Sequence, residues 1–339
     1  MDVGSSTLSP ADPSAAGARA LVLVTGGTGF VGAALVARLA TDGRHVVRAT
    51  TRTAVQSATV PHAEFVGSCH LSETTSWQRA LQGVNTVIHT AARVHVMRDA
   101  AASPLAEFRR VNVDGTIALA RQAADAGVRR FVFVSSIKVN GEATRPGAKF
   151  SADNPPAPVD AYGVSKLEAE LALHEISRAT LMEVVVVRPP LVYGPGVGAN
   201  FRSILRWLGR GVPLPFGAID NRRSIVALDN LVDLLITCID HPAAAAKTFL
   251  VSDGHDLSTT ELLRRCAKAM GRPARLLPVP VQLIDLAARC LGRAELSRRL
   301  CGSLQVDISQ TRRTLDWAPP VATDDALVRT AQHFLAAKG

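Results

Sequence analysis

Several features that would place this chain in other classes of protein are missing from its sequence. No apolar run approaches the roughly 18–20 residues that a helix needs to cross a bilayer, and the first 19 residues lack the basic start and apolar stretch of a signal peptide. The five cysteines are scattered, and no two of them have the spacing of a metal site. We therefore expect a cytoplasmic protein with reduced thiols and no metal, preceded by a disordered tail over residues 1–19.

The chain also lacks the aromatic residues that lie between basic ones in many nucleic-acid-binding surfaces. Lys and Arg number 38 against 29 Asp and Glu, a formal net charge of +9, whereas aromatic residues make up only 4% of the chain. The arginines occur as dispersed pairs such as Arg129-Arg130, and no nucleic-acid-binding motif is present. The charge therefore favours attraction of a polyanionic small molecule, such as a nucleotide, over nucleic acid.

What the sequence does contain is an alternation of short β-branched runs and helical patterns, which is typical of βαβ units. The strand candidates are nearly continuous in apolar character, as expected for strands buried on both faces. They are Ala20–Thr25, His45–Ala49, Thr86–Thr90, Phe131–Ser135 and Val184–Arg188, and helical patterns lie at Val31–Ala40, Trp77–Leu81, Pro104–Ala126 and Ala161–Ser177. These patterns predict an α/β fold with a doubly wound parallel sheet, a Rossmann fold, over residues 20–188.

The composition changes after Arg188. Proline and glycine interrupt residues 189–198, and helical patterns follow at Phe201–Leu208, Asp229–Cys238, Thr259–Ala269, Val281–Leu291 and Asp324–Ala337. We interpret residues 189–339 mainly as a smaller α+β lobe across the carboxyl ends of the strands, where ligands bind in such folds. Some of its strands and helices are expected to return to the main domain.

A glycine turn joins the first predicted strand to the first predicted helix. Glycines at positions 26, 29 and 32 have no Cβ, so the turn can be tight and its backbone can approach a pyrophosphate, which the amides of the helix would then face. The strand before and the helix after supply the context that a dinucleotide-binding loop requires. The turn therefore predicts an NAD(P) site made by Gly26, Gly29, Phe30, Val31 and Gly32.

The Thr-Gly-Gly-x-Gly-Phe-x-Gly form of this turn resembles the extended short-chain dehydrogenase/reductase family, and the resemblance extends from Leu21 to the end of the chain. Tyr162 and Lys166 are four residues apart in a helical pattern and so share one face. An ammonium beside a phenol is expected to lower the phenol pKa toward neutrality. The resemblance implies that Tyr162 exchanges a proton with substrate, that Lys166 holds the nicotinamide ribose, and that the hydroxyl of Ser136 donates to the substrate oxygen.

The identity of the serine and the role of one asparagine also follow from the resemblance. Val139-Asn140-Gly141 fills the family's Val-Tyr-Gly-like segment, which aligns Ser136 rather than Ser135 with the catalytic serine. Asn112 matches a family asparagine that holds helix and sheet together or joins a proton relay.

The end of the second strand bears on the choice of nicotinamide cofactor. Thr51 occupies the position where an acid would accept the adenosine ribose, and Arg52 offers a bidentate partner to a 2′-phosphate. We expect NADP(H) to be preferred, with NAD(H) possible. The resemblance adds four further contacts with the cofactor, which are Ser68 at the adenine, Ala91 after the strand Thr86–Thr90, and Pro189 and Val192 behind the nicotinamide.

The second half resembles sugar-nucleotide-modifying members of the family such as UDP-galactose 4-epimerase. The resemblance places Asn200 and Arg222 at the diphosphate of a UDP-sugar, and Pro215 in an extended segment that pairs with the uracil. The family's Arg-Asp-Tyr-Ile-His-x-x-Asp pattern is altered between Arg222 and Asp229, where the Asp-Tyr and His positions are replaced.

Two enzymatic functions and one non-enzymatic function follow. The resemblance is strongest to bacterial enzymes of O-antigen assembly, including UDP-N-acetylquinovosamine-forming 4-ketoreductases. It implies NADPH-dependent reduction of the C4 keto group of a UDP-4-keto-6-deoxy-N-acetylhexosamine, which Thr51-Arg52 and the altered pattern favour. The alternative is an NAD-dependent 4-epimerase of a UDP-hexose or UDP-N-acetylhexosamine, which uses the same three catalytic residues. The third is a non-catalytic NADP-binding regulator, against which the intact set of three argues.

The same resemblance implies the partners of the chain. They are a UDP-sugar and a second copy of the chain, packed through the helices near Pro104–Ala126 and Ala161–Ser177, with no nucleic acid and no membrane insertion.

Overall fold

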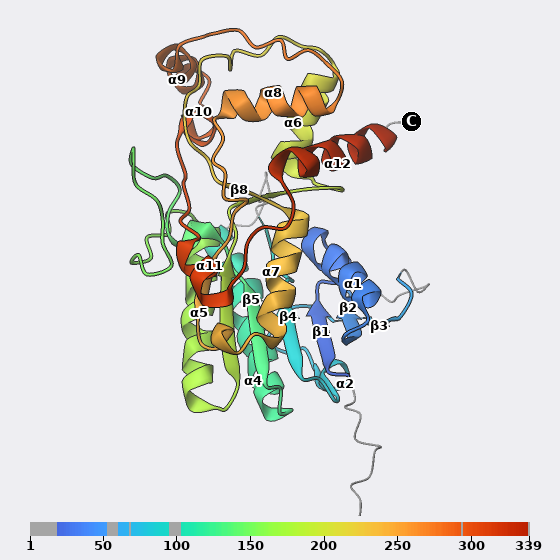
Figure 1. Ribbon diagram of the computed structural model, residues 1–339. Helices are drawn as coiled ribbons and strands as arrows, with labels where there is room; N and C mark the ends of the chain where they lie inside the picture. Colours follow the sequence, from blue (N-terminus) through green and yellow to red (C-terminus); the bar gives the residue numbers. More distant parts are fainter. Residues whose placement is uncertain (1–18, 53–59, 68, 95–102, 293, 338–339) are drawn as a thin grey trace, which may run out of the picture.

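A seven-stranded parallel sheet with helices on both faces forms the larger part of the molecule (Figure 1). The computed structural model describes residues 19–52, 60–67, 69–94, 103–292 and 294–337. The strand order is β3-β2-β1-β4-β5-β6-β9, and all neighbours in it are parallel. The predicted Rossmann fold is therefore confirmed. Residues 1–18 of the predicted tail and the adenine candidate Ser68 lie outside the described residues.

The strands of the main sheet are β1 (Leu21–Thr25), β2 (Val46–Thr50), β3 (Ala63–Val66), β4 (Thr86–His89), β5 (Arg130–Val134), β6 (Glu183–Arg188) and β9 (Thr248–Leu250), and a separate parallel pair consists of β7 (Leu191–Tyr193) and β8 (Ile225–Ala227). The five predicted strands are all present. The sequence patterns missed β3, β7, β8 and β9, and the last three have only three residues each, too few to establish a period.

The α-helices are α1 (Phe30–Asp42), α2 (Gln78–Leu81), α3 (Pro104–Phe108), α4 (Gly115–Asp125), α5 (Ala161–Ala179), α6 (Ala199–Gly209), α7 (Leu228–Asp240), α8 (Thr259–Ala269), α9 (Val281–Cys290), α10 (Ala294–Cys301), α11 (Ser309–Leu315) and α12 (Thr323–Ala336). A π-helix at Arg109–Asp114 joins α3 to α4 within the range predicted as one helix, and 3-10 turns lie at Ile137–Val139 and Pro242–Ala244. None of the described helices combines the length and apolarity needed to span a bilayer.

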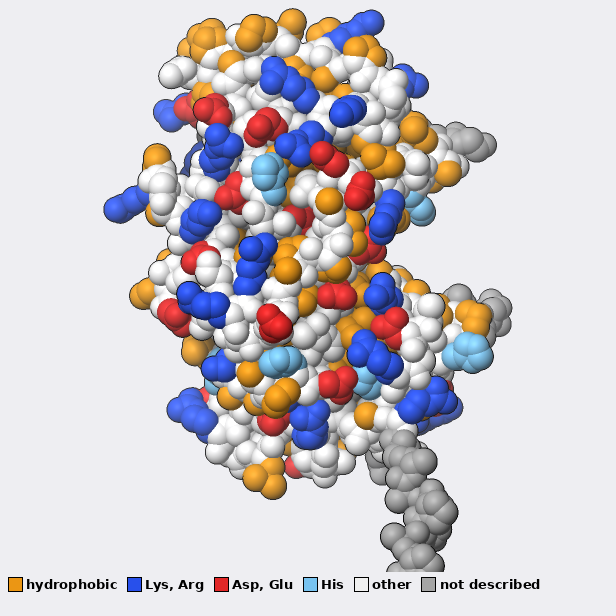
Figure 2. Space-filling view, in the orientation of Figure 1, with side chains coloured by type: hydrophobic (Ala, Val, Ile, Leu, Met, Phe, Trp, Pro, Cys, Tyr) orange, Lys and Arg blue, Asp and Glu red, His pale blue; other side chains and the backbone are white. Residues whose placement is uncertain are grey.

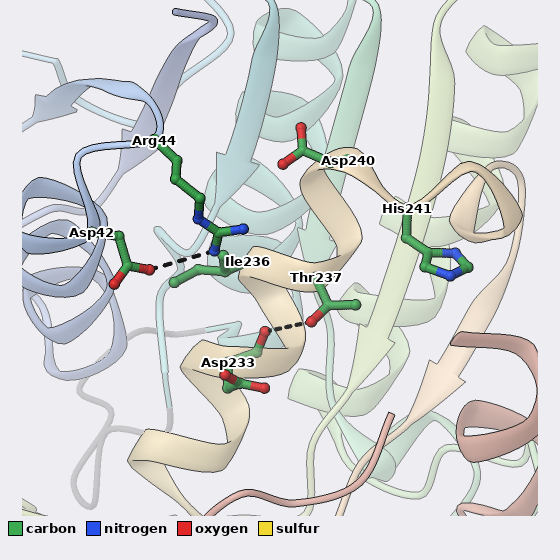
Figure 3. A pocket seen from close by; sticks show the side chains of 7 residues that line it. All are labelled: Asp42, Arg44, Asp233, Ile236, Thr237, Asp240 and His241. Carbon is green, nitrogen blue, oxygen red and sulfur yellow. Dashed lines mark hydrogen bonds and ion pairs between the residues drawn. The ribbon is translucent and has the colours of Figure 1, made fainter. Parts of the chain in front are cut away.

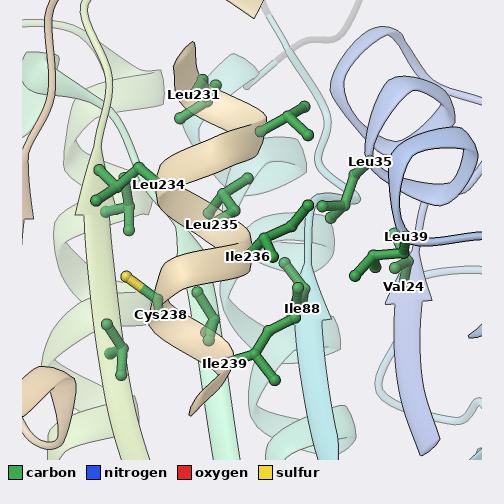
Figure 4. Packing of buried hydrophobic residues seen from close by; sticks show 14 of the residues in the cluster. Val24, Leu35, Leu39, Ile88, Leu231, Leu234, Leu235, Ile236, Cys238 and Ile239 are labelled. Carbon is green, nitrogen blue, oxygen red and sulfur yellow. The ribbon is translucent and has the colours of Figure 1, made fainter. Parts of the chain in front are cut away.

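One face of the sheet is covered by α1 and α7, which come from opposite halves of the chain (Figure 4). Leu35 and Leu39 of α1 and Leu231 and Leu235 of α7 are fully buried in one apolar cluster with strand residues such as Ile88. Removal of this much apolar surface from water is the main force that holds α7 on the sheet. A segment that follows residue 188 therefore forms part of the main domain, as does β9.

The opposite face is covered by α4 and α5, whose Leu119 and Leu173 pack with Phe131 and Phe133 of β5. A second apolar core forms from α6, α8 and α12, which lie beyond the carboxyl ends of the strands (Figure 1). The two apolar clusters of the sheet thus lie on one side of the edge at which β1, β4 and β5 end, and the core of α6, α8 and α12 lies on the other side.

Candidate active site

The glycine turn after β1 is closely packed against itself. Gly26 has φ +71°, a left-handed conformation, and its carbonyl accepts a hydrogen bond of 2.9 Å from the Gly29 amide. A Cβ on Gly32 would lie 2.2 Å from the Gly26 oxygen, so only glycine fits there. The first turn of α1 has no side-chain cap at Gly29, which leaves amides of that turn available to an anion. These features fit the pyrophosphate of a dinucleotide.

Other residues predicted to bind the cofactor lie around this turn. A Cβ on Gly26 would be 3.0 Å from the backbone of Ala91, so the residues after β4 form one wall of the turn. Thr51 is buried at the end of β2, and Arg52 beside it is exposed. Pro189 accepts a hydrogen bond of 2.9 Å from the amide of Ile137, which ties the predicted nicotinamide loop to the segment that carries the catalytic serine.

Lys166 joins α5 to the end of β5. Its Nζ donates to the Val134 carbonyl at 3.0 Å, two residues before Ser136, and lies 6.0 Å from the centre of the Tyr162 ring. Its side chain is only 2% exposed, and Nζ also lies 4.5 Å from the centre of the Phe133 ring. This contact brings the strand end that carries Ser136 next to the helix that carries Tyr162 and Lys166.

The two neighbouring serines at the end of β5 have different environments. Ser135 is buried, and its hydroxyl donates to the carboxylate of Glu170. Ser136 is partly exposed, and its Oγ accepts a hydrogen bond of 3.3 Å from the Lys138 amide. Because that contact uses only a lone pair, the Ser136 hydroxyl hydrogen can be donated to a substrate. This geometry supports the choice of Ser136 over Ser135.

Glu170 belongs to a buried charged cluster that the sequence analysis did not identify. Its carboxylate accepts from Nε and Nη2 of Arg188 at 3.0 and 2.5 Å, and Arg188 also donates to Asn140 at 3.0 Å. Both charged side chains are nearly inaccessible, at 2% and 6% for Glu170 and Arg188. The cluster fixes α5, β6 and the segment after Ser136 relative to one another. Glu170 follows Lys166 by four residues in the same helix, so the spacing alone could have predicted that Glu170 lies on the face of α5 that carries Tyr162 and Lys166.

The first turn of α5 orients Tyr162. Asp160 caps the helix by accepting from the Gly163 amide at 2.7 Å, and Lys138 forms ion pairs with Asp160 and, at 3.2 Å, with Glu142. The Tyr162 ring packs edge-on against Phe108 of α3, with 5.9 Å between ring centres. Lys138 therefore supports the start of α5 through Asp160.

The expected lowering of the Tyr162 pKa is wrong for this structure. Burial raises the pKa of the Tyr162 phenol, and the charge of Asp160 raises it further. Burial also lowers the Lys166 pKa to about 7, while the charge of Glu170 acts in the opposite direction. Spacing could predict that the two groups are neighbours, but not that desolvation outweighs their attraction. At neutral pH Tyr162 is therefore a protonated phenol beside a lysine that readily loses its proton.

Asn112 and His89 form buried hydrogen bonds between the elements that carry the site. Asn112 is buried, and its amide accepts from the Arg93 backbone amide at 2.8 Å and donates to Ser165 at 3.1 Å. It therefore holds the loop after β4 to α5, which supports the first of its two predicted roles. The His89 ring lies between the hydroxyls of Thr25 and Thr116 at 2.6 and 3.0 Å. Burial and the nearby charge of Lys166 lower the pKa of His89 to about 3, so it is neutral.

The predicted substrate residues lie in the second lobe. Pro215 is exposed, and its neighbour Leu214 exchanges backbone hydrogen bonds with Arg275 and Leu277 at 2.9 and 2.8 Å. Asn200 lies in the first turn of α6, and its side chain is outside the described part of the structure. Within the described residues, no hydrogen bond or ion pair joins Pro215 or Arg222 directly to the three catalytic candidates.

Arg222 and its neighbour Arg223 differ in their surroundings. Arg222 is 54% exposed and has two carboxylates near its guanidinium, Asp220 at 4.0 Å and Glu261 at 3.9 Å. Arg223 is partly buried, and its Nη1 donates to the carbonyls of Arg299 and Gly302, both at 2.9 Å. Burial lowers the Arg223 pKa, and its described partners are neutral carbonyls. Arg223 was not predicted, because two adjacent arginines cannot be distinguished without knowing which one points inward.

A surface pocket of about 320 Å³ lies between α1 and α7 (Figure 3). Asp42, Asp233 and Asp240 line it together with Arg44 and His241, and Arg44 is paired with Asp42 at 3.5 Å. Its walls come from the carboxyl end of α7 and the end of α1, away from the glycine turn. An acidic lining repels a diphosphate, so this pocket is not a candidate for the nucleotide site. No group of three or more His, Cys, Asp or Glu side chains in the described chain has the arrangement of a metal site.

Comparison with known proteins agrees with this geometry. Residues 22–252 match the model of the NAD dependent epimerase/dehydratase family, which covers the glycine turn, Ser136, Tyr162 and Lys166. The chain belongs to this family, and it is an NAD(P)-dependent enzyme of the epimerase or oxidoreductase type.

Among individual relatives, the chain is 48% identical to a UDP-glucose 4-epimerase of Vibrio cholerae over 317 residues, which cover 93% of this chain and 96% of that one. It is 30% identical to a UDP-glucose 4-epimerase of Mycolicibacterium smegmatis over 92% of this chain and 97% of the relative. The solved structure of MoeE5 in complex with UDP-glucose and NAD is similar with a TM-score of 0.74 and 25% identity, over 94% of this chain and 99% of that one.

Proposed function

We propose that this protein is an NAD-dependent 4-epimerase of a UDP-hexose. The observation that carries the proposal is the 48% identity to a UDP-glucose 4-epimerase over almost the full length of both chains. The predicted 4-ketoreductase uses the same residues, but the relatives favour the alternative. Whether the sugar also carries an N-acetyl group, as in O-antigen precursors, is decided by offering both kinds of substrate.

The three catalytic candidates supply proton transfer and positioning in this proposal. The glycine turn at Gly26–Gly32 would hold NAD, and the bound cofactor would supply reversible hydride transfer at C4 of the sugar. Tyr162 removes the proton of the C4 hydroxyl and gives it back, so it must pass through both protonation states. The raised Tyr162 pKa keeps the phenol protonated in this structure, so the first transfer, which needs the phenolate, is the more demanding of the two. Ser136 donates to the same oxygen, and Lys166 holds the strand end and the helix together.

The cofactor is proposed to be NAD. The family is described as NAD dependent, and MoeE5 was solved with NAD. The predicted preference for NADP depends on Thr51 and on Arg52, which is exposed. That end of β2 and the altered pattern between Arg222 and Asp229 are the observations that favour a reductase. A reductase consumes its cofactor, whereas an epimerase regenerates it.

The diphosphate of the substrate is proposed to bind at the Arg222-Arg223 pair, with Asn200 and Pro215 completing the nucleotide site. Arg223 is the stronger candidate of the two arginines, because the neutral carbonyls beside it do not offset its positive charge. Two carboxylates near Arg222 reduce its attraction for an anion.

We further propose a cytoplasmic homodimer formed through the outer faces of α4 and α5. Leu171 of α5 is 55% exposed on that side of the sheet and would be covered in such a dimer. Sedimentation velocity of the wild type and of Leu171→Glu tests this assembly, because the variant is expected to be monomeric.

The proposed activity is tested by incubating the purified protein with UDP-glucose and, separately, with UDP-N-acetylglucosamine without added cofactor. Formation of the corresponding galacto epimer supports the proposal. Tyr162→Phe is the matched control, because the substitution removes only the phenolic oxygen. The kcat of the variant should fall by several orders of magnitude, and the variant should still bind the cofactor. Stoichiometric NADPH oxidation with a 4-keto UDP-sugar, and no epimer from either substrate, would establish the reductase instead.

A further inference from the structure

Helix α9 exposes its apolar side to solvent. Leu283, Leu286, Ala287 and Cys290 recur at intervals of three and four residues, so they form one stripe along the helix. Leu283 and Leu286 are 56% and 59% exposed, and Leu291 just after the helix is 73% exposed. No residue of α9 is buried. An amphipathic helix of a folded lobe normally presents its whole apolar side to the core. In α9 the half-buried apolar residues are Val281, Ile284 and Ala288, and the leucine stripe lies outside them in solvent.

The residues before α9 extend this apolar surface. Leu277 is 52% exposed, and Pro278 and Pro280 beside it are exposed as well. The core of the second lobe is formed without the outward stripe, from α6, α8 and α12. Figure 2 shows hydrophobic side chains gathered at the top of the molecule, over the region that Figure 1 labels α9, with Lys or Arg side chains nearby. We call Leu277, Leu283, Leu286 and Leu291 the α9 leucine surface.

The segment of the chain that carries the α9 leucine surface is basic in composition. Residues 271–301 contain six arginines and only two carboxylates, Asp285 and Glu295. Both carboxylates are already in ion pairs, Asp285 with Arg289 at 2.8 Å and Glu295 with Arg299. Arg272 and Arg275 donate to backbone carbonyls, at 2.7 and 3.5 Å, and these neutral groups do not offset their charges. The segment therefore carries a net positive charge beside an exposed apolar stripe.

We propose that the α9 leucine surface docks on an anionic lipid membrane, with the leucines inserted at the level of the headgroups and the surrounding arginines against lipid phosphates. Helices with an apolar stripe and basic flanks lie in the plane of the interface in this way. Arginine near an anionic leaflet adds to the attraction. The helix does not cross the bilayer, and the catalytic residues lie in the other lobe. The proposal goes beyond the epimerase activity and does not depend on it.

The charge of the segment favours a membrane over a second copy of the chain. In a two-fold dimer through α9, the same surface of each copy meets the other, so the two sets of arginines would face each other. Repulsion between like charges opposes that arrangement. An anionic lipid surface supplies the missing negative charge and the apolar layer together.

The test is cosedimentation of the full-length protein with large unilamellar vesicles. One set consists of phosphatidylcholine, and the other of an equal mixture of phosphatidylcholine and phosphatidylglycerol. The wild type is expected to bind the mixed vesicles, to bind phosphatidylcholine less, and to be released by high salt. The double variant Leu283→Gln with Leu286→Gln should bind at least about tenfold more weakly. Leu181→Gln is the control, because Leu181 is 100% exposed in the turn before β6 and should leave binding unchanged.

Three results would overturn the proposal. They are failure of the wild type to bind the mixed vesicles, equal binding by the double variant, and an oligomer that the double variant dissociates without any vesicle binding by the wild type. Circular dichroism shows whether the double variant is folded. If it is not, Leu286→Trp decides the question. Because the chain already has three tryptophans, the emission of the variant is compared with that of the wild type. A blue shift with mixed vesicles that is larger in the variant supports docking, and an equal change in the two proteins contradicts it. Loss of the proposed epimerase activity would not alter any of these measurements.

Discussion

Replacement of Glu170 by glutamine tests the role of the buried charged cluster beneath the active site. The substitution keeps the shape of the side chain and removes its negative charge. The variant leaves Arg188, which is only 6% exposed, without its carboxylate partner, and places an amide where Ser135 now donates. Glutamine can still accept at its one oxygen, but its NH₂ group faces the guanidinium.

The size of the effect follows from burial. Removal of one partner from a buried ion pair typically costs about 3–5 kcal/mol, because the other charge stays desolvated. Glu168→Gln is the matched control on the same helix. Glu168 pairs with Arg109 at 2.6 Å, but the two side chains are 30% and 50% exposed, and such pairs contribute about 0–1 kcal/mol. Glu170→Gln should therefore destabilise the protein several times more than Glu168→Gln.

Urea unfolding followed by circular dichroism measures both variants against the wild type. A loss of less than about 1 kcal/mol for Glu170→Gln, or equal losses for the two variants, would refute the role given to the cluster. The pH dependence of kcat provides a second measurement, which would not change if Glu170 only stabilised the fold. Because the charge of Glu170 raises the Lys166 pKa, the variant should shift the kinetic pKa assigned to Lys166 to lower pH.

Three further predictions concern single groups of the site. Ser136→Ala should lower kcat by about 10²-fold, because the substrate oxygen loses a hydrogen-bond donor. Ser135→Ala should lower the stability of the fold more than it lowers kcat. The opposite pattern would assign the catalytic role to Ser135. Lys166 binds its proton more weakly in the folded chain (pKa about 7) than in the unfolded chain (10.5), so its contribution makes the free energy of unfolding rise with pH between those values. Urea titrations across this range should show a steeper rise for the wild type than for Lys166→Met, and identical slopes would contradict the lowered pKa. Arg223→Ala should weaken UDP binding in calorimetry by tenfold or more, and Arg222→Ala by less; a larger loss for Arg222→Ala would restore the original assignment.

Local signals in the sequence were sufficient for the central fold, and together with the family resemblance they named the catalytic candidates, which stay predictions. The glycine turn at Gly26–Gly32 lies between a continuous apolar strand and an amphipathic helix, so its structure is specified by adjacent residues. The Tyr162–Lys166 pair has a spacing that places both residues on one face of any helix. Ser136 could be distinguished from Ser135 by the segment that follows, and the structure supports that choice through the burial of Ser135.

Features that depend on tertiary packing could not be predicted. The shift of the Tyr162 pKa comes from burial, which spacing does not report. Strand β9 has only three residues and joins the sheet because β6 offers an unpaired edge. Helix α9 was predicted from its periodic apolar residues, but the same period fits a helix that faces a core and one that faces outward. Which of the two applies is decided by the packing of α6, α8 and α12.

The fate of the hydrogen at C4 of the sugar tests the central claim most directly. UDP-glucose or UDP-N-acetylglucosamine labelled with deuterium at C4 is converted by the purified protein in the presence of unlabelled NADH. The epimerase account predicts a galacto product that retains the deuterium at C4, because the hydride returns to the sugar from which it came. A product that has lost the label, or no product in a parallel reaction without NADH, would contradict it.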